Sequence, residues 1–181
     1  MFKKCKHFKA DLSMWDVSNS TDFYNMFYNC FEFNSDLSEW NVGRCSDFSG
    51  MFRNCFKFRS NLSQWDVSNG VDFIQMFINC HNFKSDLSRW DVSKGIEFTG
   101  MFQGCHNFKS DLSRWDVSNG LGFMDMFSNC YNLKTNFDNW DVSNGQDFNR
   151  MFYRCVNIKK PRWYKEKEPI KTVKKKNHKY D

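Results

Sequence analysis

The sequence predicts an α/β solenoid of about six to seven coils, each built from a short helix and a short strand. The dipeptide Met-Phe recurs every 25 residues along a chain of 181 residues, and within each repeat a helical spacing of apolar residues precedes an alternating one. A fixed repeat of this length is typical of stacked coils that contact only their neighbours. The repeats begin at Met1, Met26, Met51, Met76, Met101, Met126 and Met151.

The first element of each repeat is predicted to be a short helix. From Phe73 to Phe83, apolar residues fall at i, i+3, i+4, i+7 and i+10, which is one face of a helix. Asp72 precedes this run, where a carboxylate caps a helix by accepting hydrogen bonds from its first amides.

A strand and a turn complete the predicted coil. Trp90 and Val92 flank Asp91, an alternation typical of a short, half-buried strand. Asn69-Gly70 predicts a turn in which residues with positive φ lead into the next helix. Equivalent residues should then stack about 4.8 Å apart, so that columns of Trp, Val and Phe fill the core.

These residues resemble a known family. The pattern Met-Phe-x-x-Cys-x-x-Phe-x-x-Asp-Leu-Ser-x-Trp-Asp-Val-Ser-Asn is similar to the repeat of BspA-like leucine-rich-repeat proteins, and it covers residues 1–158. The resemblance implies a right-handed leucine-rich-repeat-like solenoid with a short parallel strand in each coil. It further implies a role in adhesion or protein–protein contact, without catalytic residues.

The charge distribution divides the chain into two parts. We predict a repeat solenoid over residues 1–158 and a basic, largely disordered tail over residues 159–181. The tail holds ten Lys or Arg against three Asp or Glu, and its most basic run is Lys174, Lys175 and Lys176. The rest of the chain holds 16 basic and 18 acidic residues, so the net charge of +5 comes from the tail.

Seven of the eight cysteines recur with the 25-residue repeat. Their place on the apolar face favours free, buried thiols. Disulfides between stacked cysteines and a metal site are the alternatives, although seven equivalent positions offer no discrete pairs and no Cys-x-x-Cys occurs. The eighth, Cys45, falls in a predicted turn, so we expect it to react first with a thiol reagent.

The location of the protein is predicted from the same features. Free thiols are typical of a reducing compartment. Neither a signal peptide nor an apolar run long enough to span a membrane is visible. We therefore expect an intracellular protein, or a cell-surface one if an export signal precedes Met1.

The outward face of the predicted strands is the best candidate for an interface. There a variable position lies beside an almost constant Asp, and variation on a fixed frame is how a repeat protein specifies a partner. Alternatively, Arg89 and Arg114 only neutralise the stacked carboxylates, because like charges placed opposite one another are destabilising. The candidate residues are Glu39, Gln64, Arg89 and Arg114 at the variable position, with Asp66, Asp91 and Asp116 beside them.

Three further features are weighed as sites. The turn from Asp66 to Asp72 lacks the ligand spacing of a calcium loop, so we predict no metal. A basic stripe could, together with the tail, follow a phosphate backbone, but we expect Asp residues two positions away to balance its charge; it comprises Lys9, Asn34, Arg59, Lys84, Lys109, Lys134 and Lys159. An aromatic stripe is either a partner patch or the edge of the core; it comprises Phe31, Phe56, His81, His106 and Tyr131.

Taken together, these features favour a non-catalytic repeat module that binds another protein through its solenoid faces. The alternative is a structural or assembly component whose basic tail engages nucleic acid, an acidic protein or an anionic membrane surface. Against an enzyme stand the lack of a Ser/His/Asp or Cys/His grouping and of a Gly-rich phosphate loop. We expect no cofactor. Self-association through the first coil is also expected, because nothing in the sequence covers its edge.

Overall fold

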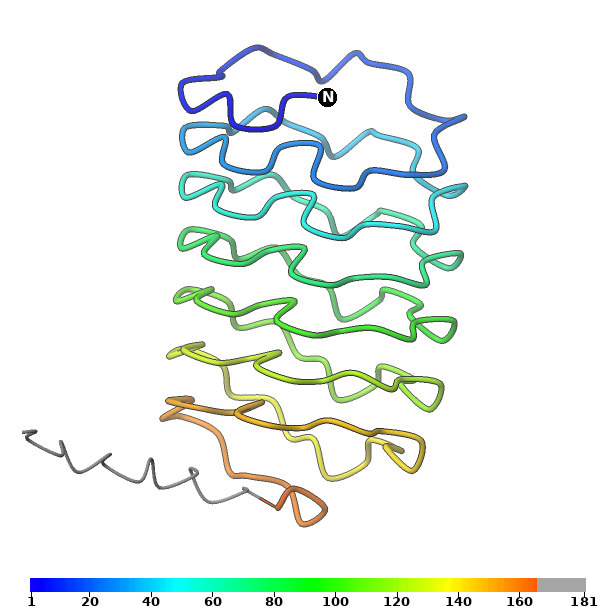
Figure 1. Cartoon of the computed structure of the whole chain (residues 1–181), viewed down its shortest axis with the longest axis vertical. Coiled ribbons are helices and arrows are strands. Elements are labelled where there is room, and N and C mark those ends of the chain that lie inside the picture. Colours follow the sequence, from blue (N-terminus) through cyan, green and yellow to red (C-terminus); the bar gives the residue numbers. More distant parts are fainter. Residues whose placement is uncertain (166–181) are drawn as a thin grey trace, which may run out of the picture.

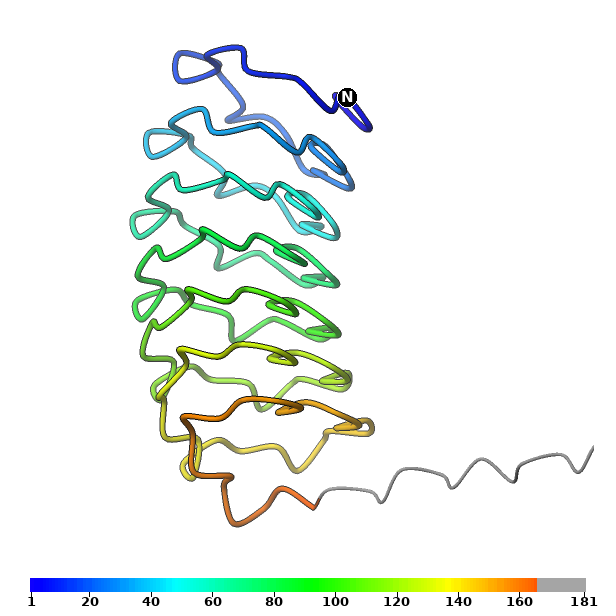
Figure 2. The ribbon, with the colours of Figure 1, turned by 90° about the vertical axis from the view of Figure 1, so that its left-hand side faces the viewer.

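The computed structural model describes residues 1–165 as a stack of coils, one for each Met-Phe pair (Figure 1). We number the coils 1 to 7, so that coil 1 begins at Met1 and coil 7 at Met151. A view turned by 90° shows the same coils following one another along a single axis (Figure 2). Residues 25 apart in the sequence therefore lie above one another.

The predicted α/β class is wrong. Residues 1–165 contain no helix, and their strand structure is limited to isolated bridges, so the coils are not the helix-and-strand units of a leucine-rich-repeat-like solenoid. Within the same residues, nothing helical is long and apolar enough to cross a bilayer. The bridges are all parallel and join Asp22 to Asp47, Asp47 to Asp72, Asp72 to Glu97, Glu97 to Gly122, and Gly122 to Asp147.

The segment predicted to be a helix, from Phe73 to Phe83, is a row of tight turns whose N–H groups alternate between two directions. In one set, each N–H donates to a carbonyl of the next coil at 2.8–2.9 Å; the donors are Phe73, Gln75, Phe77 and Asn79. In the other set, each N–H closes a turn on the carbonyl three residues earlier; the donors are Met76, Ile78, Cys80 and Phe83. A helix would instead keep each N–H for the carbonyl four residues earlier in its own segment.

Left-handed residues inside this segment also exclude a helix. Gln75 has a φ of 55° and Asn79 a φ of 58°, and L-residues do not continue a right-handed helix from that conformation. Asn and Gly adopt it most readily, and they fill the second of these two positions in most coils. The residues concerned are Asn29, Asn54, Asn79, Gly104 and Asn129.

The glycine of the predicted Asn-Gly turn is needed for a different reason from the one expected. Gly70 does not have a positive φ. A Cβ at this residue would instead lie 2.3 Å from the Cζ atom of Phe73. The glycine therefore makes room for a core ring.

The predicted strand around Trp90 shows the expected burial without the expected backbone. Trp90 and Val92 are buried and Asp91 is exposed. However, the Trp90 N–H closes a turn on the Leu87 carbonyl at 3.1 Å, and the Ser93 N–H donates to the Asp91 carboxylate at 3.0 Å. These N–H groups are used locally, so no ladder of strand hydrogen bonds forms.

Columns of stacked rings fill the core. Phe77 lies with its ring centroid 5.6 Å from those of both Phe52 and Phe102, and Trp90 lies 6.5 Å from Trp65 and 6.4 Å from Trp115. Interplanar angles of 11° or less make these contacts parallel stacks. A single coil could not bury so many rings, and a stack buries them on both faces.

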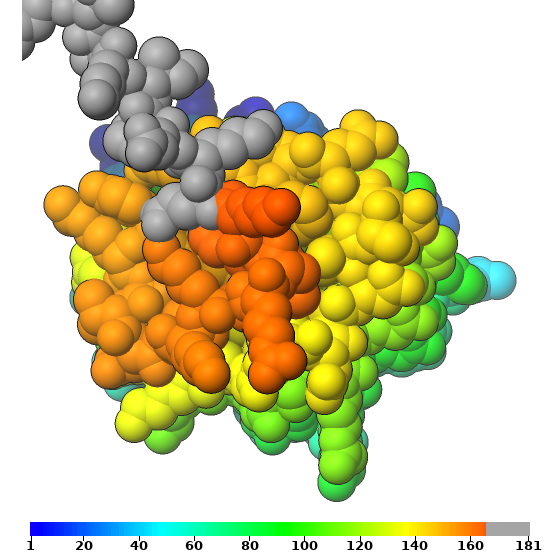
Figure 3. All heavy atoms as spheres, turned by 90° about the horizontal axis from the view of Figure 1, so that it is seen from below, coloured from blue at the N-terminus to red at the C-terminus, as the bar shows by residue number. Residues whose placement is uncertain are grey.

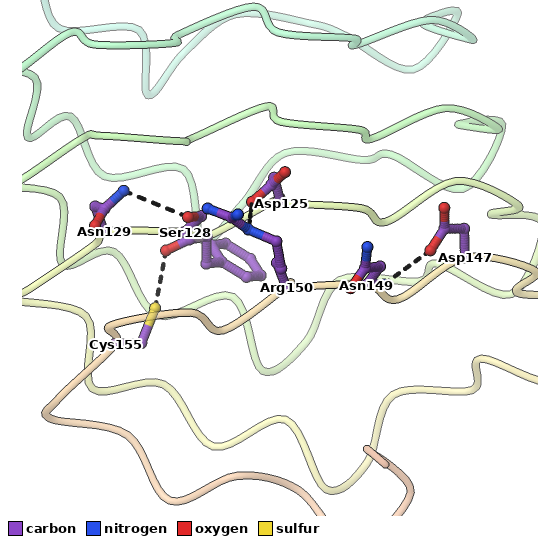
Figure 4. Close-up of polar contacts among 8 residues, drawn as sticks. Asp125, Ser128, Asn129, Asp147, Asn149, Arg150 and Cys155 are labelled. Carbon is purple, nitrogen blue, oxygen red and sulfur yellow. Dashed lines mark hydrogen bonds and ion pairs between the residues drawn. The ribbon is translucent and has the colours of Figure 1, made fainter. Parts of the chain in front are cut away.

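Buried polar side chains tie each coil to the one before it. The Trp90 Nε1–H donates to the Leu62 carbonyl at 2.9 Å, and the Cys80 thiol donates to the Phe52 carbonyl at 3.0 Å. The same contact is made by Cys155 in coil 7, whose thiol points to the previous coil in Figure 4. The indole bond recurs in coils 2 to 6 and the thiol bond in coils 2 to 7, so these buried donors are satisfied along the stack.

The C-terminal end of the stack is covered by residues that follow the last Met-Phe pair. Trp163 donates its Nε1–H to the Phe137 carbonyl at 2.8 Å and packs its ring against Phe148 and Phe152. Tyr164 is buried beside it. Figure 3 shows this segment lying across the end of the molecule. Trp163 and Tyr164 thus pack on coil 7 although they lie beyond the predicted solenoid boundary at residue 158.

The thiols correct one sequence-based prediction. All eight cysteines are free, and only Cys5 is exposed. Cys45, which we expected to react first, is fully buried and donates to the Asp47 carbonyl at 3.2 Å. Burial raises the pKa of the Cys45 thiol to about 12, which leaves almost none of the reactive thiolate at neutral pH.

Trp90→Ala should lower the free energy of unfolding by about 3–5 kcal/mol, the usual cost of deleting a large buried aromatic side chain. The control is Trp15→Ala. Trp15 holds the same repeat position in coil 1 but is 42% exposed, so we expect a clearly smaller loss. Urea unfolding curves of the two variants measure the difference, and equal losses would contradict the proposed core.

With a thiol reagent applied to the native protein, we expect one fast modification, at Cys5, and seven slow ones. The seven buried thiols should become reactive only on denaturation, because burial hinders both access and ionisation. Mass spectrometry of peptides after timed labelling identifies the modified residue. Early labelling of Cys45 would show that its coil opens in the native state.

Candidate functional site

All seven residues predicted for the interface are exposed. They form two neighbouring columns on the outside of the stack, but no sheet lies beneath them. We call the first the variable column, with the residues Met14, Glu39, Gln64, Arg89, Arg114 and Asn139. The second is the Asp column, with the residues Asp16, Asn41, Asp66, Asp91, Asp116 and Asp141.

The Asp column has a structural role. The carboxylates of Asp66, Asp91 and Asp116 each accept the N–H of the Ser two residues later at 3.0 Å. Hydrogen bonds from Ser68 and Ser93 lower the pKa of Asp66 and Asp91 respectively, so these carboxylates stay ionised. The turns account for the near-constant Asp without any ligand.

The variable column has no such local role. Within residues 1–165, Arg89 and Arg114 take part in no ion pair, so the structure pairs neither guanidinium with the Asp column. Their side chains project from a frame whose neighbouring positions are fixed by turns. This arrangement leaves the variable column free to contact a partner.

A second surface is a groove lined by four cations of the predicted basic stripe. It has a volume of about 620 Å³. No acidic residue lines it, and we call it the basic groove. Its cations come one from each of coils 3 to 6, and an Asn from each of coils 4 to 6 lies between them. The lining residues are Arg59, Lys84, Lys109 and Lys134 with Asn82, Asn107 and Asn132.

The aromatic stripe borders this groove and forms a continuous stack, which we call the ring column. Its ring centroids are 4.6–5.2 Å apart, from Phe31 through Phe56, His81 and His106 to Tyr131. Side-chain amides connect the groove to the ring column. The Nδ2 atoms of Asn82, Asn107 and Asn132 donate to backbone carbonyls of the ring-column residues at 2.7–2.9 Å. Both faces of Phe56, His81 and His106 are therefore covered by neighbouring rings, while Tyr131, which ends the column, is 37% exposed.

Metal binding finds no support in the described part of the chain. Asp72, at the turn weighed for calcium, accepts the Ile74 N–H at 2.9 Å. No group of three His, Cys, Asp or Glu side chains in residues 1–165 is arranged to hold a metal ion. The predicted tail residues Lys174, Lys175 and Lys176 lie outside the described residues.

The geometry defines a tandem-repeat protein of stacked, turn-built coils with exposed columns along its sides. The chain belongs to the family described as "Mycoplasma protein of unknown function, DUF285", which matches residues 1–87 and again residues 60–164. No curated protein and no solved structure matches the chain. The resemblance to BspA-like repeats stays a prediction.

His81→Phe should make stability less dependent on pH. Burial, with a smaller contribution from His106, lowers the pKa of His81 below its usual 6.5. The unfolded chain therefore takes up this proton first, and stability falls as the pH drops below about 6.5. Phe56 fills the same position in the coil before, so the variant should fold with less of this loss.

The measurement is the urea midpoint at about pH 7 and about pH 5, compared between the variant and the natural sequence. Glu97 acts in the opposite sense, because burial raises its pKa above 4.5 and its contribution to stability is lost as the pH rises. Glu97 is present in both proteins, so its effect cancels when the variant is compared with the natural sequence. An unchanged pH dependence would show that His81 does not titrate within the stack.

Proposed function

We propose that the protein is a non-catalytic repeat module that binds another protein through its outer columns. The observation that carries this proposal is the variable column, which changes from coil to coil while the residues around it keep one local structure. Glu39, Gln64, Arg89 and Arg114 all stand on this column, each beside a residue held in a turn. A rigid frame with one free column supports specific recognition at low entropic cost.

The core supports the same proposal. The aromatic rings, the thiols and the indole N–H groups that elsewhere serve chemistry are used here for packing and for bonds between coils. His81 and His106 lie face to face at 4.6 Å, each with another ring on its far side. This arrangement commits both imidazoles to the ring column, which supports a binding role over a catalytic one.

We also propose that the protein works inside the cell, in a reducing compartment. Eight free cysteines support this, since thiols at this density persist where glutathione and thioredoxin keep them reduced. Six of them donate to a carbonyl of the preceding coil, and oxidation would break these bonds.

Arg89→Glu/Arg114→Glu should weaken binding of the partner by roughly tenfold or more, because charges placed across an interface set both the rate of encounter and the choice of partner. The experiment captures proteins from native lysate on the immobilised chain and then measures the affinity of the captured protein for each variant. Arg44→Glu/Arg154→Glu is the control with the same change of charge outside the variable column.

Both double variants should remain folded, since exposed residues without ion pairs contribute little to stability, and urea unfolding verifies this. Equal binding by both variants and the natural sequence would exclude the variable column as the contact surface. Conversion of a small molecule by the purified chain would contradict the non-catalytic role itself.

A further inference from the structure

The cations of the basic groove lack the acidic partner that the same position has in coil 1. There Lys9 Nζ lies 2.7 Å from Glu32 Oε2 in coil 2. In the same register, Arg59 faces Asn82, Lys84 faces Asn107 and Lys109 faces Asn132. An amide cannot neutralise a cation, and none of these three cations forms an ion pair in the part of the chain that the structure describes.

The nearby Asp residues do not balance the groove from inside. Asp86 and Asp111 follow Lys84 and Lys109 by two residues, yet neither lines the groove. The Asp86 carboxylate accepts the Ser88 N–H at 3.0 Å and the Ser110 hydroxyl at 2.9 Å, and Asp111 accepts the Ser113 N–H at 3.0 Å. These hydrogen bonds leave the carboxylates charged beside the groove, but the groove itself is lined only by cations and amides.

The asparagines give the groove a second kind of recognition. The Nδ2 atoms of Asn82, Asn107 and Asn132 are used for bonds to the preceding coil at 2.8, 2.7 and 2.9 Å. Their Oδ1 atoms accept no hydrogen bond from residues 1–165 and stay available as acceptors beside the cations. A ligand that fits must carry anionic groups for the cations and N–H donors for the asparagines.

An acidic peptide has both kinds of group, since its carboxylates are anionic and its backbone supplies N–H donors. A nucleic acid also has anions, but its N–H donors lie on the bases and not along the phosphodiester backbone. Nucleic-acid strands also bind by stacking their bases on free aromatic faces. The rings beside the middle of the groove offer none, because His81 and His106 stack on each other at 4.6 Å with an angle of 2° between the ring planes, and Phe56 and Tyr131 cover their other faces.

We propose that the basic groove binds an extended acidic segment of a partner protein, laid across coils 3 to 6. From Arg59 to Lys134 the groove covers three coil steps, about 14 Å at roughly 4.8 Å per step. About four to five extended residues span that length at roughly 3.3 Å each. The proposal depends on the proposed function only in taking the ligand to be a protein, and it uses a surface separate from the variable column.

The test measures fluorescence anisotropy of a short, labelled peptide rich in Asp and Glu, titrated with the protein at about 50 and about 200 mM salt. A peptide of the same length with Asn and Gln in their place, and a labelled oligothymidylate, are the comparison probes. We expect the acidic peptide to bind, binding to weaken at the higher salt concentration, and both other probes to bind less tightly.

The groove variant is Lys84→Gln/Lys109→Gln, and it should weaken binding of the acidic peptide by at least about tenfold. Its matched control is Arg44→Gln/Lys94→Gln, which removes the same two charges from residues outside the groove and should change the affinity less than about twofold. Urea unfolding of both variants verifies that each remains folded.

Three results would overturn the proposal: no binding of the acidic peptide to the natural sequence, equal affinity of the groove variant, or tighter binding of the oligothymidylate. The last would identify the groove as a nucleic-acid site. The variable-column variant Arg89→Glu/Arg114→Glu should still bind the acidic peptide. Loss of the captured partner by this variant and loss of the acidic peptide by the groove variant therefore report on two separate surfaces.

Discussion

Hydrogen bonds between successive coils, kept in a 25-residue register, are the constraint on which the rest of the structure depends. The Phe77 N–H reaches the Met101 carbonyl at 2.9 Å, while the Cys80 thiol and the Trp90 indole reach carbonyls of the coil before. A coil one residue longer would misalign all of these bonds together. Each buried donor left without a partner costs about 1–3 kcal/mol, so the length of the repeat is fixed by its polar groups as firmly as by its rings.

This register explains why most positions of the repeat keep the same residue and few positions vary from coil to coil. An Asp or Asn closes a turn at several places in the coil, as Asp86 and Asp91 do with Ser88 and Ser93. Ser85 accepts the buried Leu62 N–H of the preceding coil at 2.8 Å. Residues that look functional because they recur are therefore parts of the frame. Recognition falls to positions that the frame leaves unused, which are the variable column and the basic groove.

The sequence predicted which residues are buried better than it predicted the backbone. The spacing i, i+3, i+4 and i+7 from Phe73 to Cys80 is shared by a helix and by consecutive four-residue turns, and only the helix was inferred from it. Asn at left-handed positions, such as Asn54 and Asn79, was the available signal against a helix. Exposure of the seven interface residues followed from alternation alone. The sequence grouped the four cations of the groove in one basic stripe, but it did not predict the groove itself, because the shape and the Asn lining depend on which residues of adjacent coils face each other.

The asparagines of the groove take part in the bonds between coils, whereas its cations do not. Asn82 donates to the Phe56 carbonyl at 2.8 Å, a bond that the carboxylate of Glu32 has no proton to make. An Asn in this column therefore adds a hydrogen bond between coils and leaves the facing cation without a carboxylate partner. The cations themselves make no such contribution, and coil 2 carries the neutral Asn34 in their place. Because like charges in single file oppose folding, an acidic ligand of the kind proposed for the basic groove would offset the repulsion among Arg59, Lys84, Lys109 and Lys134.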